Sequence, residues 1–250
     1  MTSEFVHLHN HSDYSLLDGA QTVQTLVNTI DDLGMDSVAL TEHGNMFSVI
    51  PYYKSAKKAG VKPIIGCETY VAVGSRFDKK PRSDGGWGNN HLVLLAQNYT
   101  GYRNLMKLVT YGYLDGFYYR PRVDIDLLKE HNEGIICLSG CLKGEVTEKM
   151  LKDDWDGAKE AALRFAEIFE NRFYLEVQNH GIPDEVKNIQ NMKKLAGELN
   201  LPLVCTNDAH YAKHEHWEAH DVHICLGTGK DRNDPNRLRY ATPEFYFKTQ

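Results

Sequence analysis

The sequence predicts an α/β protein whose sheet forms a TIM-like but incomplete barrel, with an open doubly wound sheet as the alternative. Two observations support this: seven short runs have the composition of strands, and helical periods lie between most of them. Such alternation favours parallel strands in one sheet that helices cover or close. The runs are Phe5–His9, Ser37–Leu40, Pro63–Tyr70, Leu92–Ala96, Ile135–Leu138, Phe173–Val177 and Leu203–Thr206.

Four segments between these runs have the pattern of helices. Residues 22–34 carry apolar side chains at helical spacing and stop at Gly34, a residue type that commonly follows the last turn of a helix. The other three are residues 53–60, 154–170 and 183–200. Together they predict helices on the outside of the sheet.

Three segments break this pattern. Residues 74–90 are rich in glycine and basic residues, and residues 111–124 are rich in aromatics and arginine, so we expect both to be loops. Residues 226–250 lack a core pattern and look like part of something longer. We therefore expect a barrel domain over residues 1–225 and a C-terminal segment that leads toward a further region.

The composition is that of an ordinary soluble globular protein: 42% of the 250 residues are hydrophobic and 25% are charged. The net charge of −6 argues against a protein that wraps duplex DNA, so any contact with nucleic acid must be local. No apolar run is long enough to cross a membrane, and the N-terminal sequence is not a signal peptide. We expect a cytoplasmic protein without membrane contact, with its cysteines as free thiols.

The stretch FVHLHNHSDYSLLDGA, residues 5–20, places histidines at alternate positions of the first expected strand. Side chains at i and i+2 share one face of a strand, so His7 and His9 are expected to point the same way. Taken alone, this pattern fits a solvent-facing edge strand equally well. Metal-binding residue types recur at the other strands, mostly just past the carboxyl ends, where β/α folds build their sites. They are His43, Glu68, His91, Cys141, Asp208 and His210.

Five stretches resemble the successive motifs of the PHP (polymerase and histidinol phosphatase) superfamily: HLHNHSDYSLLDG, TEHGN, GCETY, SGCLKGE and TNDAHY. SLLDG, FYYRPR, LSGCL and HDVHICLGTGK are similar to its replicative branch, found at the N-terminus of bacterial DNA polymerase III alpha subunits. The resemblance covers essentially the whole chain. It implies a distorted seven-stranded β/α barrel with a metal site at the carboxyl ends of the strands. The implied metal ligands are His7, His9, Asp18, His43, Glu68, His91, Cys141, Asp208 and His210.

A ligand set of this size exceeds the needs of one ion, since zinc takes about four ligands. Two or three divalent ions fit it, with Glu68 as a bridging carboxylate. Imidazoles and a thiolate favour Zn²⁺, while the carboxylates leave Mn²⁺ or Fe²⁺ open. Clustered ions of this kind activate water and neutralise a phosphate during hydrolysis. Within the set we expect His9, Asp18 and Asp208 to be catalytic.

Four residues are expected to contact the substrate. His11 follows the first strand, so we place it on the substrate side of the site rather than among the ligands. Tyr119, Arg120 and Arg122 belong to the segment FYYRPR, where they could stack on bases and hold the phosphates of a single strand. The alternative is that the aromatic side chains pack under their own loop.

Two other groups of polar residues are expected to lie outside the site. His216, His220 and His223 fit one face of a helix, but Trp217 stands where the zinc motif HExxH requires glutamate. A solvated or partner-facing helix is therefore expected. The second group is Glu176, Gln178 and His180, at the end of the sixth expected strand. We interpret them as a polar strand end, and the alternative is that they contact the metal ligands or the substrate.

The resemblance implies metal-dependent hydrolysis of phosphodiesters, as a 3′→5′ exonuclease that proofreads the single-stranded 3′ end of DNA. Two alternatives stay open: a metal-bound scaffold that supports and docks a polymerase, or a phosphatase of small monoesters. The expected partners are DNA, the remainder of a polymerase III alpha chain and other replisome subunits. We expect no polymerase active site within these residues.

Overall fold

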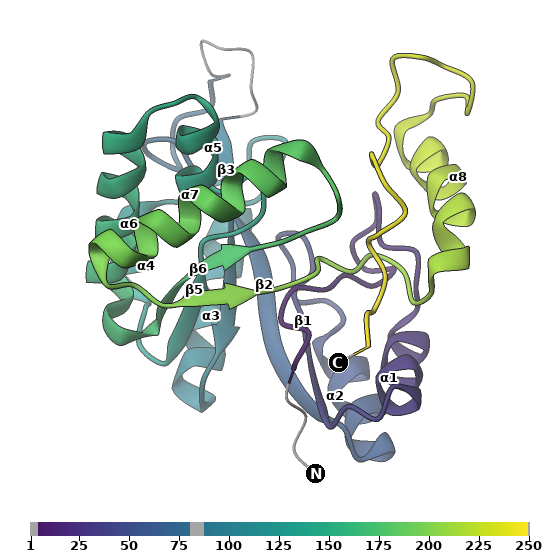
Figure 1. The fold of residues 1–250 in the computed structure, drawn as a ribbon. Coiled ribbons are helices and arrows are strands. Elements are labelled where there is room, and N and C mark those ends of the chain that lie inside the picture. The colour runs from purple at the N-terminus through teal and green to yellow at the C-terminus, as the bar shows by residue number, and fades with distance from the viewer. Residues whose placement is uncertain (1–4, 81–87, 250) are drawn as a thin grey trace.

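The computed structural model describes residues 5–80 and 88–249 and shows a curled sheet of seven strands (Figure 1). The sheet order is β1-β2-β3-β5-β6-β7, and the short β4 pairs with β2. The strands are β1 (Ser37–Leu40), β2 (Lys62–Ala72), β3 (Asn89–Ala96), β4 (Arg122–Val123), β5 (Ile135–Leu138), β6 (Phe173–Val177) and β7 (Leu203–Cys205). The predicted fold class, a distorted seven-stranded barrel, is confirmed.

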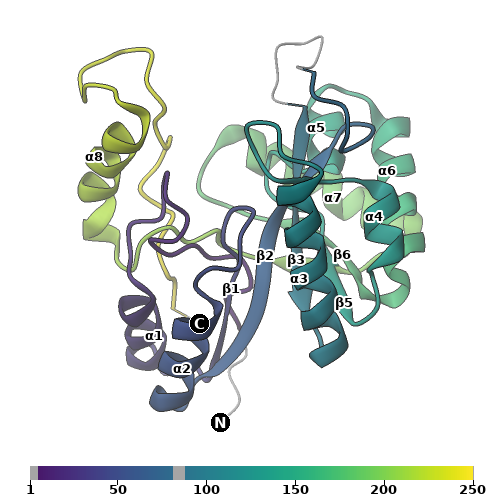
Figure 2. The ribbon, with the colours of Figure 1, turned by 180° about the vertical axis from the view of Figure 1, so that it is seen from behind.

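Helices cover the outside of this sheet. Figures 1 and 2 show α1 and α2 together beside β1, α3 along β2 and β3, and α4 to α7 over the other half. The helices are α1 (Val23–Asp32), α2 (Val49–Ala59), α3 (Tyr99–Leu114), α4 (Ile125–Glu130), α5 (Glu145–Leu151), α6 (Trp155–Phe169), α7 (Pro183–Leu199) and α8 (Trp217–Thr228), with short 3₁₀ turns η1 (Glu170–Arg172) and η2 (His214–His216). Over the described ranges, none of them combines the length and the apolar character that a membrane span needs.

The expectation of a loop over residues 111–124 is right only for residues 115–121 and 124. The first part ends α3, and Arg122–Val123 form β4. The helix buries Leu105 and Leu108 on one face and exposes its aromatic side chains on the other, which made the segment look like a loop. The expected loop over 74–90 falls partly on residues 81–87, which lie outside the described residues, and its last two residues begin β3.

An all-parallel sheet was also expected, and β3 departs from it. This strand pairs antiparallel with both β2 and β5, whereas the other strand pairs are parallel. Because β3 is reversed, its first residues lie at the edge where its neighbours end, and His91 faces Tyr70 across the ladder. Hydrophobic periodicity does not record strand direction, so the sequence pattern could not reveal this.

Residues 5–9 are not a regular strand, although residues 7–11 join the two edges of the sheet. Ala39 N donates to His7 O at 2.8 Å on the β1 side, and His11 N donates to Ala209 O at 2.8 Å beyond β7. The side-chain amide of Asn10 donates to the carbonyls of His7 and Ala39. This irregular backbone breaks the rule of alternate faces on which the pairing of His7 with His9 depended.

The inside of the barrel is apolar at one end. Ala39, Val93, Leu95 and Leu138 form this layer, which we call the barrel floor, and all are buried. The metal-binding residue types lie above it, at the edge where the parallel strands end. Two larger apolar clusters fill the space between the sheet and its helices.

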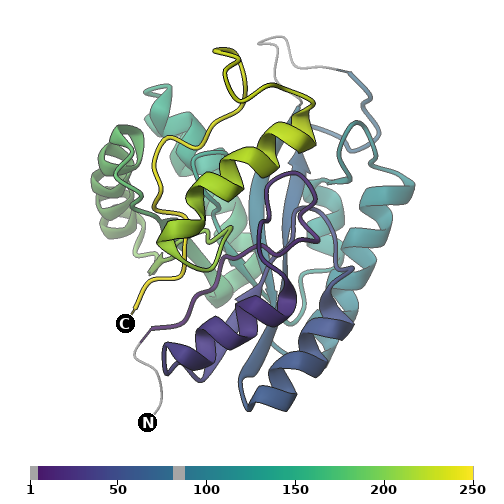
Figure 3. The same ribbon diagram turned by 90° about the vertical axis from the view of Figure 1, so that its right-hand side faces the viewer.

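Residues 237–248, which we call the strap, run back from the loop after α8 toward the N-terminal segment (Figures 1 and 3). Phe247 of the strap is buried in the same cluster as the core residues of α1 and α2. The domain boundary at residue 225 stays a prediction, but residues beyond it pack on the barrel and reach its site.

Candidate metal centre

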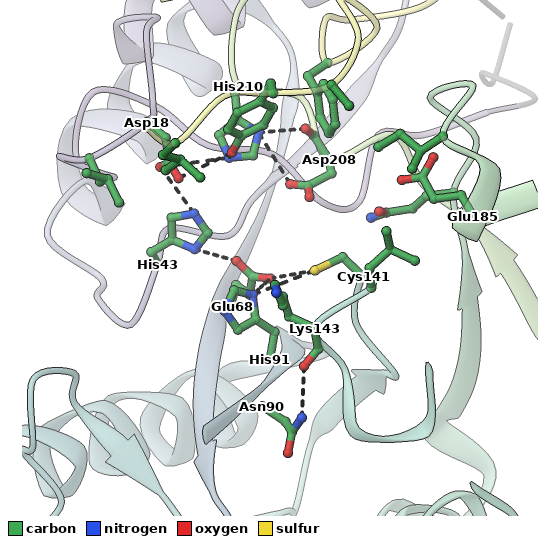
Figure 4. A pocket seen from close by; sticks show the side chains of 18 of the residues that line it. Asp18, His43, Glu68, Asn90, His91, Cys141, Lys143, Glu185, Asp208 and His210 are labelled. Atoms are coloured by element: carbon green, nitrogen blue, oxygen red, sulfur yellow. Dashed lines mark hydrogen bonds and ion pairs between the residues drawn. The ribbon is translucent and has the colours of Figure 1, made fainter. Parts of the chain in front are cut away.

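Eight of the nine expected ligands, together with His11, gather at the edge of the sheet above the barrel floor. Several of them line a cavity of about 620 Å³, where they point toward one another from separate strands and loops (Figure 4). We call this set the rim cluster. Its members are His9, His11, Asp18, His43, Glu68, His91, Cys141, Asp208 and His210.

Glu68 lies at the centre of the rim cluster. Its carboxylate oxygens are 2.7 Å from His91 Nδ1, 3.4 Å from His9 Nε2 and 3.5 Å from His11 Nε2. His43 Nδ1 also contacts it, at 2.5 Å. The side chain can reach from β2 into the barrel because β2 continues past the end of β1 to Ala72. A single carboxylate with four imidazole neighbours is suited to bridge two ions.

Two aspartates extend the cluster on the side of the loops. Asp208 Oδ1 lies 3.2 Å from His11 Nε2 and 3.4 Å from His9 Nε2. Asp18 Oδ1 lies 3.3 Å from His43 Nε2 and 3.9 Å from His210 Nε2. His210 links the two carboxylates, since its Nδ1 also lies 3.6 Å from Asp208 Oδ1.

Cys141 completes the cluster on the β5 side. Its Sγ lies 3.9 Å from Glu68 Oε1 and 3.8 Å from His91 Nδ1. Taken alone, this cysteine resembles a core thiol, and only its motif marked it as a ligand. The loop after β5 places it beside the carboxylate and imidazole that the motif implied.

Six buried nitrogen and oxygen atoms of the rim cluster make no hydrogen bond, although each lies within ion-pair distance of another member. They are His9 Nε2, His11 Nε2, Asp18 Oδ1, His43 Nδ1, Glu68 Oε2 and Asp208 Oδ1. A buried polar atom without a hydrogen bond costs about 1–3 kcal/mol, so six such atoms that face one another indicate room for a shared partner. Three groups of these side chains bring their ligand atoms within 4.8 Å of one another. The donor set fits divalent cations.

The carboxylates of the cluster raise the pKa values of the histidines beside them. Burial lowers the pKa of His9, but the carboxylates of Asp208, Glu176 and Glu68 outweigh it and raise that pKa well above its usual range. Burial also acts against His43, whose pKa Asp18 and Glu68 raise in the same way. Excess negative charge therefore surrounds these imidazoles, as a cation site requires.

The effects on Glu68 and His11 run the other way. Burial alone would raise the pKa of Glu68, but His91 and His43 hold it well below its usual range, so the carboxylate stays ionised. Burial, aided by His43 and His210, lowers the pKa of His11 to about 3. A neutral imidazole is the form that binds metal.

His7 does not join the cluster. Its ring lies between those of Phe5 and Phe247, with centroids 4.9 Å from each, and its Nε2 is 3.0 Å from the carbonyl of Lys248. Sequence reasoning placed His7 among the ligands and His11 on the substrate side, whereas in the structure His11 lies in the rim cluster and His7 outside it. The cause is the irregular backbone between these residues.

Glu176 is a part of the site that sequence reasoning set aside. Its Oε1 lies 2.7 Å from His9 Nδ1, and its Oε2 accepts a hydrogen bond from Gly140 N at 2.9 Å. A carboxylate on the far nitrogen of a ligating histidine orients the ring and sets its tautomer. The signal was present: Glu176 is the one charged residue of the short apolar strand FYLEV.

The three expected substrate residues of the segment FYYRPR separate. Arg120 lines the cavity, and its guanidinium lies 5.3 Å from the centre of the Tyr70 ring. Tyr119 is 63% exposed. Arg122 is buried and donates to the carbonyls of Gly116 and Asp78, at 3.0 and 2.8 Å, so it ties loops together instead of facing the cavity.

The expected helix with three histidines is also only partly observed. His220 and His223 lie in α8, while His216 belongs to the short turn η2 before it. His220 is buried, and its Nε2 lies 2.8 Å from the backbone carbonyl of Asp18. It therefore supports the loop that carries Asp18.

The curled seven-stranded sheet and the cluster of metal-binding residue types at its edge point to one class of protein. A comparison with known families identifies that class. Residues 7–180 match the family model of the PHP domain. The chain belongs to the PHP domain family.

Individual similar proteins point to a narrower group within this family. The chain is 48% identical over 248 residues to the DNA polymerase III subunit alpha of Borreliella burgdorferi, covering 99% of this chain and 22% of that protein. It is 48% identical over 246 residues to the same subunit of Treponema pallidum, covering 98% and 21%. The subunit of Thermus aquaticus is 43% identical over 248 residues, covering 98% and 20%. The chain thus spans about a fifth of the length of these relatives.

Solved structures show weaker likenesses. One is a two-domain protein from Bacteroides vulgatus that contains a predicted PHP-like metal-dependent phosphoesterase (TM-score 0.47, 16% identity, 82% of this chain and 51% of that chain). Another is an amidohydrolase from Chromobacterium violaceum with bound sulfate (TM-score 0.46, 12% identity, 82% and 87%). With TM-scores below 0.5, neither carries weight for the function.

Proposed function

We propose that this chain hydrolyses phosphodiesters with two or three divalent metal ions and removes nucleotides from the 3′ end of single-stranded DNA. The observation that carries the proposal is the set of six buried ligand-type atoms in the rim cluster that face one another without a hydrogen bond. The cluster opens to a cavity of about 620 Å³, large enough for a nucleotide. The similarity to DNA polymerase III alpha subunits supports DNA as the substrate.

The ions would be held by three overlapping groups of side chains. These are His9, His11 and Asp208; His43, Glu68 and His91; and His11, His43 and His210. We assign His11 the ligand role that sequence reasoning gave to His7. The imidazoles and the nearby Cys141 favour Zn²⁺, while the carboxylates suit Mn²⁺ or Fe²⁺ as well.

Bound ions would supply an activated water and neutralise the charge of the phosphate. The residues of the chain would hold that chemistry in place. Glu176 fixes the ring of His9, so that Nε2 faces Glu68 and Asp208. Arg120, at the cavity wall, is placed to pair with a substrate phosphate.

The proposal includes the setting of this activity. Because the chain spans about a fifth of its relatives, we propose that it works beside the remainder of a polymerase III alpha chain. Other replisome subunits would be neighbours in the cytoplasm, where bacterial DNA is copied. Cleavage at the 3′ end would then remove misincorporated nucleotides.

The test uses the chain with single-stranded DNA labelled at its 5′ end, in Zn²⁺ or Mn²⁺. We expect a ladder of products shortened from the 3′ end. Asp208→Asn and Asp18→Asn should abolish it, whereas Asp156→Asn, an exposed change on α6, should not. Melting curves would confirm that all variants fold.

Three outcomes would contradict the proposal. A fully metal-loaded chain that cleaves DNA no faster than Asp208→Asn, yet melts at a higher temperature than that variant, would favour the structural scaffold. Histidinol phosphate turned over far faster than DNA would favour a monoester phosphatase. Internal cuts without terminal products would rule out an exonuclease.

A further inference from the structure

The strap crosses the cavity wall and is anchored on both sides of Tyr240. On the N-terminal side of Tyr240, the guanidinium of Arg237 donates to the carboxylate of Asp221 of α8 at 2.6 and 2.7 Å. On its C-terminal side, the ring of Phe245 stacks on that of His180, with centroids 3.8 Å apart. The position of Tyr240 is therefore set by contacts outside the rim cluster.

Tyr240 directs its hydroxyl into the rim cluster. The oxygen lies 3.0 Å from His210 Nε2 and 3.3 Å from Asp18 Oδ2. Its ring packs edge-on against Phe245 and His220, with centroids 4.5 and 4.7 Å away. A residue from the last tenth of the chain thus contacts two ligand candidates that are far apart in the sequence.

The contact of the second ring nitrogen of His210 shows which nitrogen of the neutral ring carries the hydrogen. Its Nδ1 lies 2.8 Å from the backbone carbonyl of Asp208, and a carbonyl oxygen can only accept. The neutral ring therefore carries its hydrogen on Nδ1 and a lone pair on Nε2. That lone pair can accept the hydroxyl hydrogen of Tyr240 or bind a cation, but not both.

We propose that Tyr240 is a positioning residue of the metal centre, a role that rests on the metal-dependent function proposed above. Its hydroxyl holds His210 and Asp18 with Nε2 and Oδ1 at 3.9 Å. Two ligands of one tetrahedral ion lie about 3.3 Å apart when each is about 2.0 Å from it. When His210 Nε2 turns to an ion, the hydroxyl donates to Asp18 Oδ2 alone and fixes that carboxylate.

The substitution Tyr240→Phe isolates this role, since it removes the hydroxyl and keeps the ring that packs on Phe245 and His220. The matched control is Tyr246→Phe, on the same strap. The ring of Tyr246 contacts His214 and Lys248 and does not line the cavity. Melting curves of the metal-free proteins would show whether each variant keeps the fold.

The readout is Zn²⁺ affinity, measured by competition with a chromophoric chelator. We expect Tyr240→Phe to bind the same number of ions per chain as the wild type, with one of them about 10–100-fold more weakly. Tyr246→Phe should match the wild type at every step of the titration.

Two results would overturn the inference, and each points to a different failure. If Tyr240→Phe binds zinc as tightly as the wild type while Asp18→Asn binds it more weakly, the metal centre stands and Tyr240 is only part of the cavity wall. If the wild type itself binds no zinc, the proposed function fails together with the role of Tyr240.

Discussion

On β3, Val93 and Leu95 point into the barrel floor, whereas His91, two residues earlier on the same face, reaches the rim cluster. The floor is apolar and closely packed. The rim holds buried atoms without hydrogen bonds and carboxylates beside imidazoles. The same strands therefore build two layers. The apolar floor stabilises the fold, and the polar rim holds ligand atoms that need bound cations. Changes in the floor should affect stability, and changes in the rim should affect metal and activity.

The largest effect is expected at the centre of the rim. Glu68→Gln keeps the shape of the side chain but removes the charge that four histidines contact. Hydrolysis of single-stranded DNA should fall at least about a hundredfold, since changes merely beside metal ligands already cost about 10–100-fold. A variant that retains half of the wild-type rate would show that Glu68 is not a ligand.

A floor change should act on stability instead. Leu95 is 2% exposed, so Leu95→Ala should lower the free energy of unfolding by about 2–5 kcal/mol, measured in urea. Ions bound per folded chain should stay the same. Leu114→Ala, at a position 74% exposed, is the control and should change stability by less than about 0.5 kcal/mol. Loss of metal from folded Leu95→Ala would break the distinction between floor and rim.

A smaller effect is expected one contact away from the rim. Glu176→Gln should weaken metal binding about 10–100-fold, because the amide no longer holds His9 Nδ1 by a charge-assisted hydrogen bond. Glu160→Gln, on the exposed face of α6, is the control and should have no effect. Chelator competition measures both. Equal affinities in the two variants would remove Glu176 from the site.

The mildest test is pH. Above 6.5, the ordinary value, unfolded histidines are neutral, while His9 and His43 in the folded chain keep their protons because their pKa values are raised. The folded state then binds more protons, so the chelated protein should lose stability as the pH rises from about 6.5 to 8. His11, with a pKa of about 3, is neutral in both states there and adds no slope.

Melting temperatures of the chelated protein measure this slope. Addition of Zn²⁺ should flatten it, because ions replace the protons that hold the cluster together. A melting temperature that rises with pH in the chelated protein would contradict the charge balance described for the rim.

Much of the fold could be predicted from the sequence, because strands and helices leave local patterns. The runs at β1, β5 and β6 have the predicted bounds, and α1 ends before Gly34, whose φ of +70° suits glycine. The direction of β3 could not be predicted, since alternation looks the same in both directions. The helix α3 was missed because aromatic side chains dominate its exposed end.

The residues of the site, too, could be predicted only in part. Motif resemblance pointed to eight residues that the structure brings together, across as many as 200 positions of sequence. It also included His7, which lies outside the rim cluster: residues 5–9 do not form a regular strand, so alternate side chains there need not share a face. Tyr240 had no signal, because the strap has neither helical nor strand periodicity and its position depends on contacts with distant residues.

The central claim is that the rim cluster holds divalent ions, and elemental analysis of the purified chain tests it most directly. The account predicts two or three ions per folded chain, with fewer in Asp208→Asn and an unchanged number in Asp156→Asn. A folded wild-type chain that carries no ions, and takes up none from Zn²⁺, Mn²⁺ or Fe²⁺, would contradict it.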